Sequence, residues 1–159
     1  MTELVASLKY RGRRMTITNE SISLEEARLV AEACQRKATD IKQPMQIAIV
    51  DNGGNLVMHL RMDEAWLGSA DIALNKAFTA KCFNISTADL GKESQPGKQF
   101  YGIHNSNHGR IMLFAGGVPL LKDGKVIGAL GVSGGSGEQD SQVAEAGKAA
   151  LEKTFATVR

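Results

Sequence analysis

Two tight turns between short apolar segments constrain the fold of this chain more than any other feature. Asp51-Asn52-Gly53-Gly54 separates residues 46–50 from 56–62, and Lys122-Asp123-Gly124-Lys125 separates 118–121 from 126–133. Asp, Asn and Gly tolerate the positive φ angles that tight hairpin turns require. Strands joined in this way pair antiparallel, because parallel neighbours need a crossover of a dozen or more residues. The sequence therefore predicts two β-hairpins.

Helical patterns precede, separate and follow these hairpins. Ser23-Leu24-Glu25-Glu26 has the form of a capping box, and apolar residues then recur every three or four positions to about residue 41. Similar patterns predict helices at 69–83 and 138–155, with a short helix at 87–93 between them. A further apolar segment at 111–115 is predicted as a strand. The expected fold is a single-domain α/β/α sandwich with a mostly antiparallel, five-stranded sheet covered by helices.

Length and composition indicate one globular domain. The chain has 159 residues, of which 43% are hydrophobic and 23% charged. A folded chain of this length buries about 68–70% of the surface that the unfolded chain exposes, so its core needs no disulfides. We assign residues 1–15 to a basic N-terminal tail and residues 16–159 to the single domain.

Charge and hydropathy argue against two classes of partner. The 19 Lys and Arg residues against 17 Asp and Glu give a net charge of +2, well below the basic excess of a nucleic-acid-binding domain. No apolar run approaches the roughly 18 residues of a membrane span. Residues 1–15 lack the basic start and apolar stretch of a signal peptide. We therefore expect a cytoplasmic protein that binds neither nucleic acid nor membrane.

Motifs for catalysis are weak. Gly134-Gly135-Ser136-Gly137 precedes a helix, but it matches neither a Rossmann motif nor a P-loop, and Glu138 and Asp140 in the first helical turn would repel a phosphate. Residues 131–135 have the letters G-x-S-x-G, yet they leave an antiparallel hairpin instead of the parallel sheet of a hydrolase. We predict no catalytic residue.

Eleven of the 17 glycines lie between Gly97 and Gly137. Gly128 and Gly131 fall inside a predicted strand, where a missing side chain indicates a bulge or a flat group close to the backbone. We expect a ligand or a neighbouring subunit to contact this part of the chain.

Histidines are the most informative polar residues. His104 and His108 share a polar, glycine-bearing loop at 97–110 with Tyr101, and His59 lies on strand 56–62 opposite its more apolar face. A two-histidine metal site is one interpretation, although no third ligand is evident. An axial bond to a porphyrin iron requires less, namely one imidazole, an apolar wall and a cleft.

Five blocks of the sequence resemble, in order, the GlcG/HbpS-like haem-binding family, which includes the C-terminal domain of PduO-type corrinoid adenosyltransferases. The blocks are AIVDNGGNL (48–56), RMD (61–63), KAFTA (76–80), GGVPL (116–120) and GALGVSG (128–134). QPG (95–97) and FYGIH (100–104) are similar to the propanediol- and glycerol-utilisation branch. The resemblance covers about residues 16–155. It implies a profilin-like fold, a homo-oligomer and binding of haem or a related ligand.

The leading hypothesis is a non-enzymatic haem- or tetrapyrrole-binding accessory protein, linked to corrinoid-dependent propanediol or glycerol metabolism and associated with a microcompartment. We select His104, His108, His59, Tyr101 and Arg110 as candidate cofactor-binding residues, with haem as the cofactor and the identity of any other metal left open.

Two alternatives remain at this point. One is a small-molecule binding module or enzyme for an organic acid or diol, with a pocket formed by Asp51, Arg61, Asp63, Lys76 and the turn at 131–135, in which Arg61 and Lys76 bind a carboxylate. The other is an assembly subunit without a ligand.

Overall fold

The computed structural model of the chain describes residues 16–157, so the predicted basic tail at 1–15 lies outside the described residues. The elements, in chain order, are α2 (Leu24–Asp40), β1 (Gln46–Asp51), β2 (Leu56–Arg61), α3 (Ser69–Phe83), α4 (Thr87–Lys92), two short 3-10 turns (Ile103–Asn105 and Asn107–Gly109), β3 (Gly117–Lys122), β4 (Lys125–Ser133) and α5 (Gly137–Thr157).

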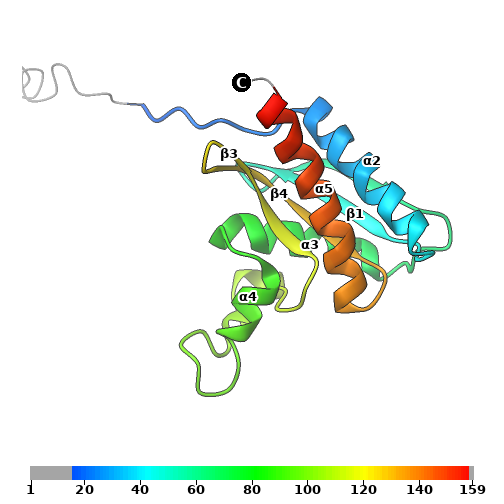
Figure 1. Cartoon of the computed structure of the whole chain (residues 1–159). Coiled ribbons are helices and arrows are strands. Elements are labelled where there is room, and N and C mark those ends of the chain that lie inside the picture. The colour runs from blue at the N-terminus through cyan, green and yellow to red at the C-terminus, as the bar shows by residue number, and fades with distance from the viewer. Residues whose placement is uncertain (1–15, 158–159) are drawn as a thin grey trace, which may run out of the picture.

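These elements form three layers around one sheet (Figure 1). The strand order is β2-β1-β4-β3, and every pairing is antiparallel. Helices α2 and α5 pack together on one face, against Ile47, Ile49 and Leu130 among others. Helix α3 covers the opposite face, where its alanines meet Ala48 and Ala129. The predicted α/β/α sandwich and both predicted hairpins are confirmed.

The sheet has four strands where the sequence predicts five, because residues 111–115 do not join it. Met112 donates its backbone N–H to Thr79 Oγ1 at 3.0 Å, and the Phe114 carbonyl accepts a hydrogen bond from Thr87 Oγ1 at 2.7 Å. Side chains of α3 and α4 thus satisfy backbone groups that a neighbouring strand would otherwise satisfy. The segment crosses these helices instead of pairing with a strand.

Reciprocal caps begin both helices of the α2–α5 layer. Ser23 Oγ accepts the Glu26 N–H at 3.2 Å while the Glu26 carboxylate accepts the Ser23 N–H at 2.8 Å, which confirms the predicted capping box. Ser136 and Gln139 repeat the arrangement at α5, with distances of 3.3 and 2.9 Å. Each cap satisfies backbone N–H groups that a helix start leaves unpaired, at about 1 kcal/mol per cap.

Gly131 allows α3 to lie directly against the sheet. A Cβ atom at this position would overlap the backbone carbonyl of Ala73 and lie 2.5 Å from the backbone nitrogen of Ala77. Both atoms belong to the main chain of α3, so neither can rotate away. At Gly128 the neighbours are the Val50 carbonyl and the Ile22 side chain. The group predicted to lie close to these glycines is therefore the protein itself, not a ligand or a second subunit.

The substitution Gly131→Ala is expected to lower the free energy of unfolding by about 2 kcal/mol, because α3 must move off the sheet to accept the methyl group. Gly68→Ala is the matched control, since nothing lies within 4 Å of the added carbon, and it should change stability by less than about 0.5 kcal/mol. Urea unfolding followed by circular dichroism measures both. Equal, small effects would contradict the close approach of α3.

Candidate functional site

The chain that follows α4 extends away from the three-layer body (Figure 1). We call residues 97–110 of this segment, which contain both 3-10 turns, the projecting loop. Gly102 (φ 87°), just before the first 3-10 turn, and His108 (φ 58°), within the second, have left-handed backbone conformations. Local hydrogen bonds hold these turns, such as the one from the Ser106 N–H to the Ile103 carbonyl at 2.9 Å. Turn geometry therefore sets the shape of this loop.

The loop presents two histidines and two aromatic rings to solvent. His104 and His108 are both exposed, and among the residues the structure describes neither imidazole has a hydrogen-bond or ion-pair partner. Tyr101 is 67% exposed and Phe100 is 42% exposed. Neither imidazole is used in holding the fold, so their ring nitrogens are open to a ligand.

His59 is in a different position, on β2 beside Ala48 and on the face of the sheet that α3 covers. Its Nε2 lies 2.9 Å from Oε1 of the buried Gln46, whose Nε2 donates to the Trp66 carbonyl at 3.2 Å. Because that carbonyl can only accept, Gln46 presents its oxygen to His59, and His59 Nε2 carries the proton.

The hydrogen bond to Gln46 limits what His59 can bind. Partial burial lowers the pKa of its imidazole, which favours the neutral ring. The remaining nitrogen, Nδ1, is adjacent to the carbon that joins the ring to the main chain, so a large planar ligand is sterically hindered there. Within residues 16–157, neither His104 nor His108 makes a hydrogen bond that occupies a ring nitrogen.

Arg110 fixes the base of the loop on α3. Its Nε donates to Asn75 Oδ1 at 3.1 Å, and its guanidinium carbon lies 3.7 Å from the centroid of the Phe78 ring. Its backbone carbonyl accepts a hydrogen bond from Thr79 Oγ1 at 3.3 Å. The five predicted site residues thus fall into three places: the loop (Tyr101, His104 and His108), the loop base on α3 (Arg110), and β2 (His59).

A buried ion pair, which the sequence analysis missed, connects α3 to the start of α5. Lys76 Nζ donates to Asp140 Oδ2 at 2.6 Å and to the Val132 carbonyl at 2.9 Å, and the two charged side chains are 0% and 3% exposed. Asp140 Oδ1 also accepts the Gly135 N–H at 3.0 Å. Burial lowers the pKa of Lys76, and the hydrogen bond and charge of Asp140 oppose that shift.

This pairing excludes Lys76 from the predicted organic-acid pocket. Its ammonium group is surrounded by Asp140, the Val132 carbonyl and the ring of Phe114, whose centroid lies 4.4 Å away. Asp51, another residue of that pocket, accepts the Gly53 and Asn55 N–H groups within the β1–β2 turn. The charged groups of Lys76 and Asp51 therefore make hydrogen bonds that stabilise the fold.

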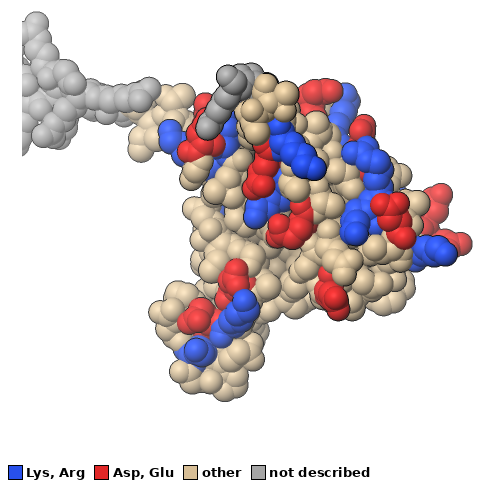
Figure 2. All heavy atoms as spheres, in the orientation of Figure 1, with Lys and Arg blue, Asp and Glu red and all other residues tan. Residues whose placement is uncertain are grey.

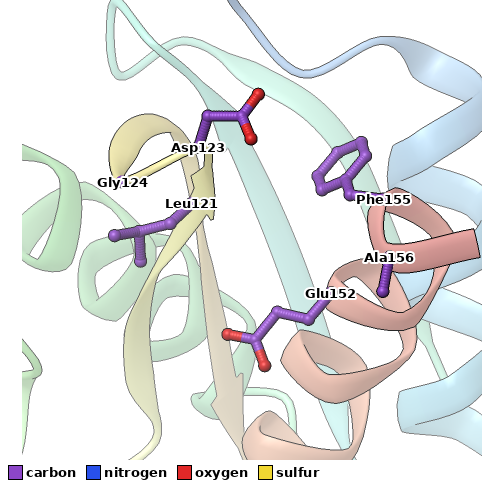
Figure 3. A pocket seen from close by; sticks show the side chains of 6 residues that line it. All are labelled: Leu121, Asp123, Gly124, Glu152, Phe155 and Ala156. Carbon is purple, nitrogen blue, oxygen red and sulfur yellow. The ribbon is translucent and has the colours of Figure 1, made fainter. Parts of the chain in front are cut away.

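Two hollows on the surface are lined by none of the five predicted site residues. One of about 290 Å³ lies between the β3–β4 turn and the end of α5, where the carboxylates of Asp123 and Glu152 and the ring of Phe155 line it (Figure 3). Another of about 590 Å³ lies between α2 and α5, with Arg36 and Lys37 in its wall. Within residues 16–157, no three His, Cys, Asp or Glu side chains gather as metal ligands.

Charged side chains of both signs are interspersed over the face that α2 and α5 form, and the projecting part also carries both signs (Figure 2). That face therefore has no extended area of one charge. No helix between residues 16 and 157 combines the length and the apolar character needed to cross a membrane.

Comparison with known proteins defines the class of protein. The family model "Haem degrading protein HbpS-like" matches residues 22–149, most of the described chain. The chain belongs to this HbpS-like family, and the predicted resemblance is confirmed.

Individual relatives refine the class. An uncharacterised 15.0 kDa protein from the dhaT-dhaS intergenic region of Citrobacter freundii is 46% identical over 125 residues, which cover 79% of this chain and 88% of that protein. Corrinoid adenosyltransferase PduO of the same organism is 37% identical over 150 residues, covering 92% of this chain but only 45% of PduO. A solved PduOC–haem complex has a TM-score of 0.79 and 35% identity, covering 82% of this chain and 94% of that one.

Removing the buried cation at position 76 tests the ion pair. Lys76→Met leaves the Asp140 carboxylate buried without a counter-charge, which should lower the free energy of unfolding by about 3–5 kcal/mol. Adding Asp140→Asn should recover much of that loss, since the buried charge is removed and an amide oxygen can still accept the Gly135 N–H.

Lys92→Met is the control for the ion pair, because Lys92 and Asp89 also lie 2.7 Å apart but their side chains are 73% and 53% exposed. This surface pair should matter little. Thermal and urea unfolding measure all three variants. If Lys76→Met is no more damaging than Lys92→Met, the Lys76–Asp140 pair does not hold α3 to α5.

Proposed function

We propose that this protein is a non-enzymatic accessory protein that binds haem, or a related iron tetrapyrrole, through the projecting loop. The observation that carries the proposal is that His104 and His108 are exposed, unpaired within the described residues and on the same loop as the exposed rings of Phe100 and Tyr101. Membership of a family described as haem-degrading and similarity to a PduOC–haem complex support haem as the ligand.

The donor groups of the loop fit an iron tetrapyrrole. A neutral imidazole is the commonest axial ligand of haem iron, and a tyrosine phenol is another. His104 or His108 would hold the iron, Tyr101 would be a second oxygen or aromatic contact, and Phe100 would cover apolar porphyrin surface. Bound haem would supply an iron centre able to accept an electron or a small ligand.

A second copy of the chain would complete such a site. Ligand sites usually cover 70–90% or more of the ligand surface, which one exposed loop does not. Exposed rings such as Phe100 and Tyr101 on a projecting segment are typical of a surface that another subunit covers. We therefore include a homo-oligomer in the proposal.

The relatives support the metabolic setting that we propose. The similarity to PduO and to a protein of a dhaT-dhaS region links the chain to propanediol utilisation and extends the proposal to glycerol metabolism. Within that setting we place the protein in the cytoplasm, in association with a microcompartment. As an accessory protein it would store, deliver or sense the tetrapyrrole.

Titration of the purified protein with hemin tests the proposal. We expect a saturable shift of the Soret band at one hemin per chain. His104→Ala or His108→Ala should weaken binding at least about tenfold and change the spectrum, because an axial ligand is lost. His59→Ala is the matched histidine control and should leave both unchanged. Absence of a saturable shift would reject haem binding, and loss of the shift only in His59→Ala would reject the loop as the site.

The non-enzymatic part needs its own measurement, because the family description refers to haem degradation. Bound hemin, incubated with ascorbate in air, should lose its Soret band no faster than free hemin does. Faster loss, accompanied by release of iron, would show that the chain catalyses degradation.

A further inference from the structure

Arg110 is held in one position while its terminal nitrogens remain unused. Its Nε donates to Asn75 Oδ1 at 3.1 Å, and the Phe78 ring lies against the guanidinium carbon at 3.7 Å. The side chain is half-buried at the base of the loop. Within the part of the chain that the structure describes, neither Nη atom has a hydrogen-bond or ion-pair partner.

The partner of Nε is itself fixed. Asn75 is only 7% exposed, and its Nδ2 donates to Asp71 Oδ2 at 3.3 Å. This contact determines which way the amide faces, so Oδ1 is directed to Arg110. The main chain of Arg110 is fixed as well, since its N–H donates to the Asn107 carbonyl at 3.2 Å and its carbonyl accepts from Thr79. The guanidinium group is therefore pre-organised.

A guanidinium in this state is suited to a carboxylate. The planar group presents its two Nη atoms as a fork that matches the two oxygens of a carboxylate, and contact with a ring removes water from one side. Because Arg110 is already ordered, binding costs little additional side-chain entropy. Anchoring the loop explains the use of Nε and of the ring contact, but it leaves the Nη atoms without a role.

We propose that Arg110 binds a carboxylate of the ligand, which for a tetrapyrrole is a propionate, at the base of the loop. The identity of the ligand rests on the proposed function, whereas the recognition of a carboxylate rests on Arg110 alone. Iron coordination and carboxylate recognition are then separate contributions from different residues.

Free-base protoporphyrin IX and its dimethyl ester separate these contributions, because neither has iron and only the acid has carboxylates. Binding can be followed by quenching of Trp66, which is the single tryptophan and is 65% exposed. The protein should bind the acid at least about tenfold more tightly than the ester. Arg110→Gln should abolish this preference and leave ester affinity unchanged. Arg110→Lys should lose most of it, because the fork is gone.

Two further variants sharpen the experiment. Asn75→Ala keeps the charge of Arg110 but releases Nε, so it should reduce the preference only partly. Arg28→Gln is the matched control, since Arg28 is an exposed arginine on α2 that pairs with Glu25, and it should retain the full preference. Sodium succinate at millimolar concentration should not compete with the porphyrin. If it does, the site takes small organic acids and the tetrapyrrole assignment is wrong.

The outcomes distinguish the two proposals. If Arg110→Gln weakens acid and ester equally, or changes neither, Arg110 does not recognise a carboxylate, although hemin binding stands. If the acid is preferred through Arg110 but hemin gives no histidine-dependent spectrum, carboxylate recognition stands and iron binding by the loop is wrong. If neither porphyrin nor hemin binds, both proposals are overturned.

Discussion

The ion pair between Lys76 and Asp140 is the interaction on which the arrangement of this molecule depends. It crosses the interior from α3 to the start of α5, and through the Val132 carbonyl it also holds the end of β4. A buried pair of this kind contributes little over a well-packed apolar pair, but the loss of one partner is costly because the other charge stays buried. The position of α3 therefore depends on α5, and the position of α5 depends on α3.

Helix α3 transmits this constraint to the candidate site. Within about one turn, Lys76 faces the core, while Asn75, Phe78 and Thr79 contact Arg110 and the segment after it. Gly131 beneath the helix removes the side chain that would push it outward. A ligand bound at the base of the loop would therefore meet groups whose positions are set by the core. The loop histidines, held only by local turns, are freer to adjust to a ligand.

Local signals allowed much of the fold to be predicted from the sequence. The turns at 51–54 and 122–125 specified the hairpins, and the Ser23–Glu26 capping box specified where α2 begins. The strand expected at 111–115 was wrong because its backbone partners, Thr79 and Thr87, are distant in sequence and lie on helices. The Lys76–Asp140 pair left only one trace, a lysine within an apolar, small-residue helix stripe, and its partner is 64 residues away. The partners of Arg110 and His59 are equally non-local, so those side chains could be selected, but their hydrogen bonds could not be predicted.

The fold uses His59 through its hydrogen bond to Gln46, and we propose that it leaves His104 and His108 for a ligand. Long-range ¹H–¹⁵N spectra of protein labelled at histidine test it directly, because the chain has only three imidazoles. Without ligand, His59 should show the neutral Nε2–H tautomer that Gln46 imposes. On addition of hemin, the signals of His104 or His108 should be lost to the paramagnetic iron while the tautomer of His59 is retained. Loss of the His59 signal, with both loop imidazoles unaffected, would contradict the account.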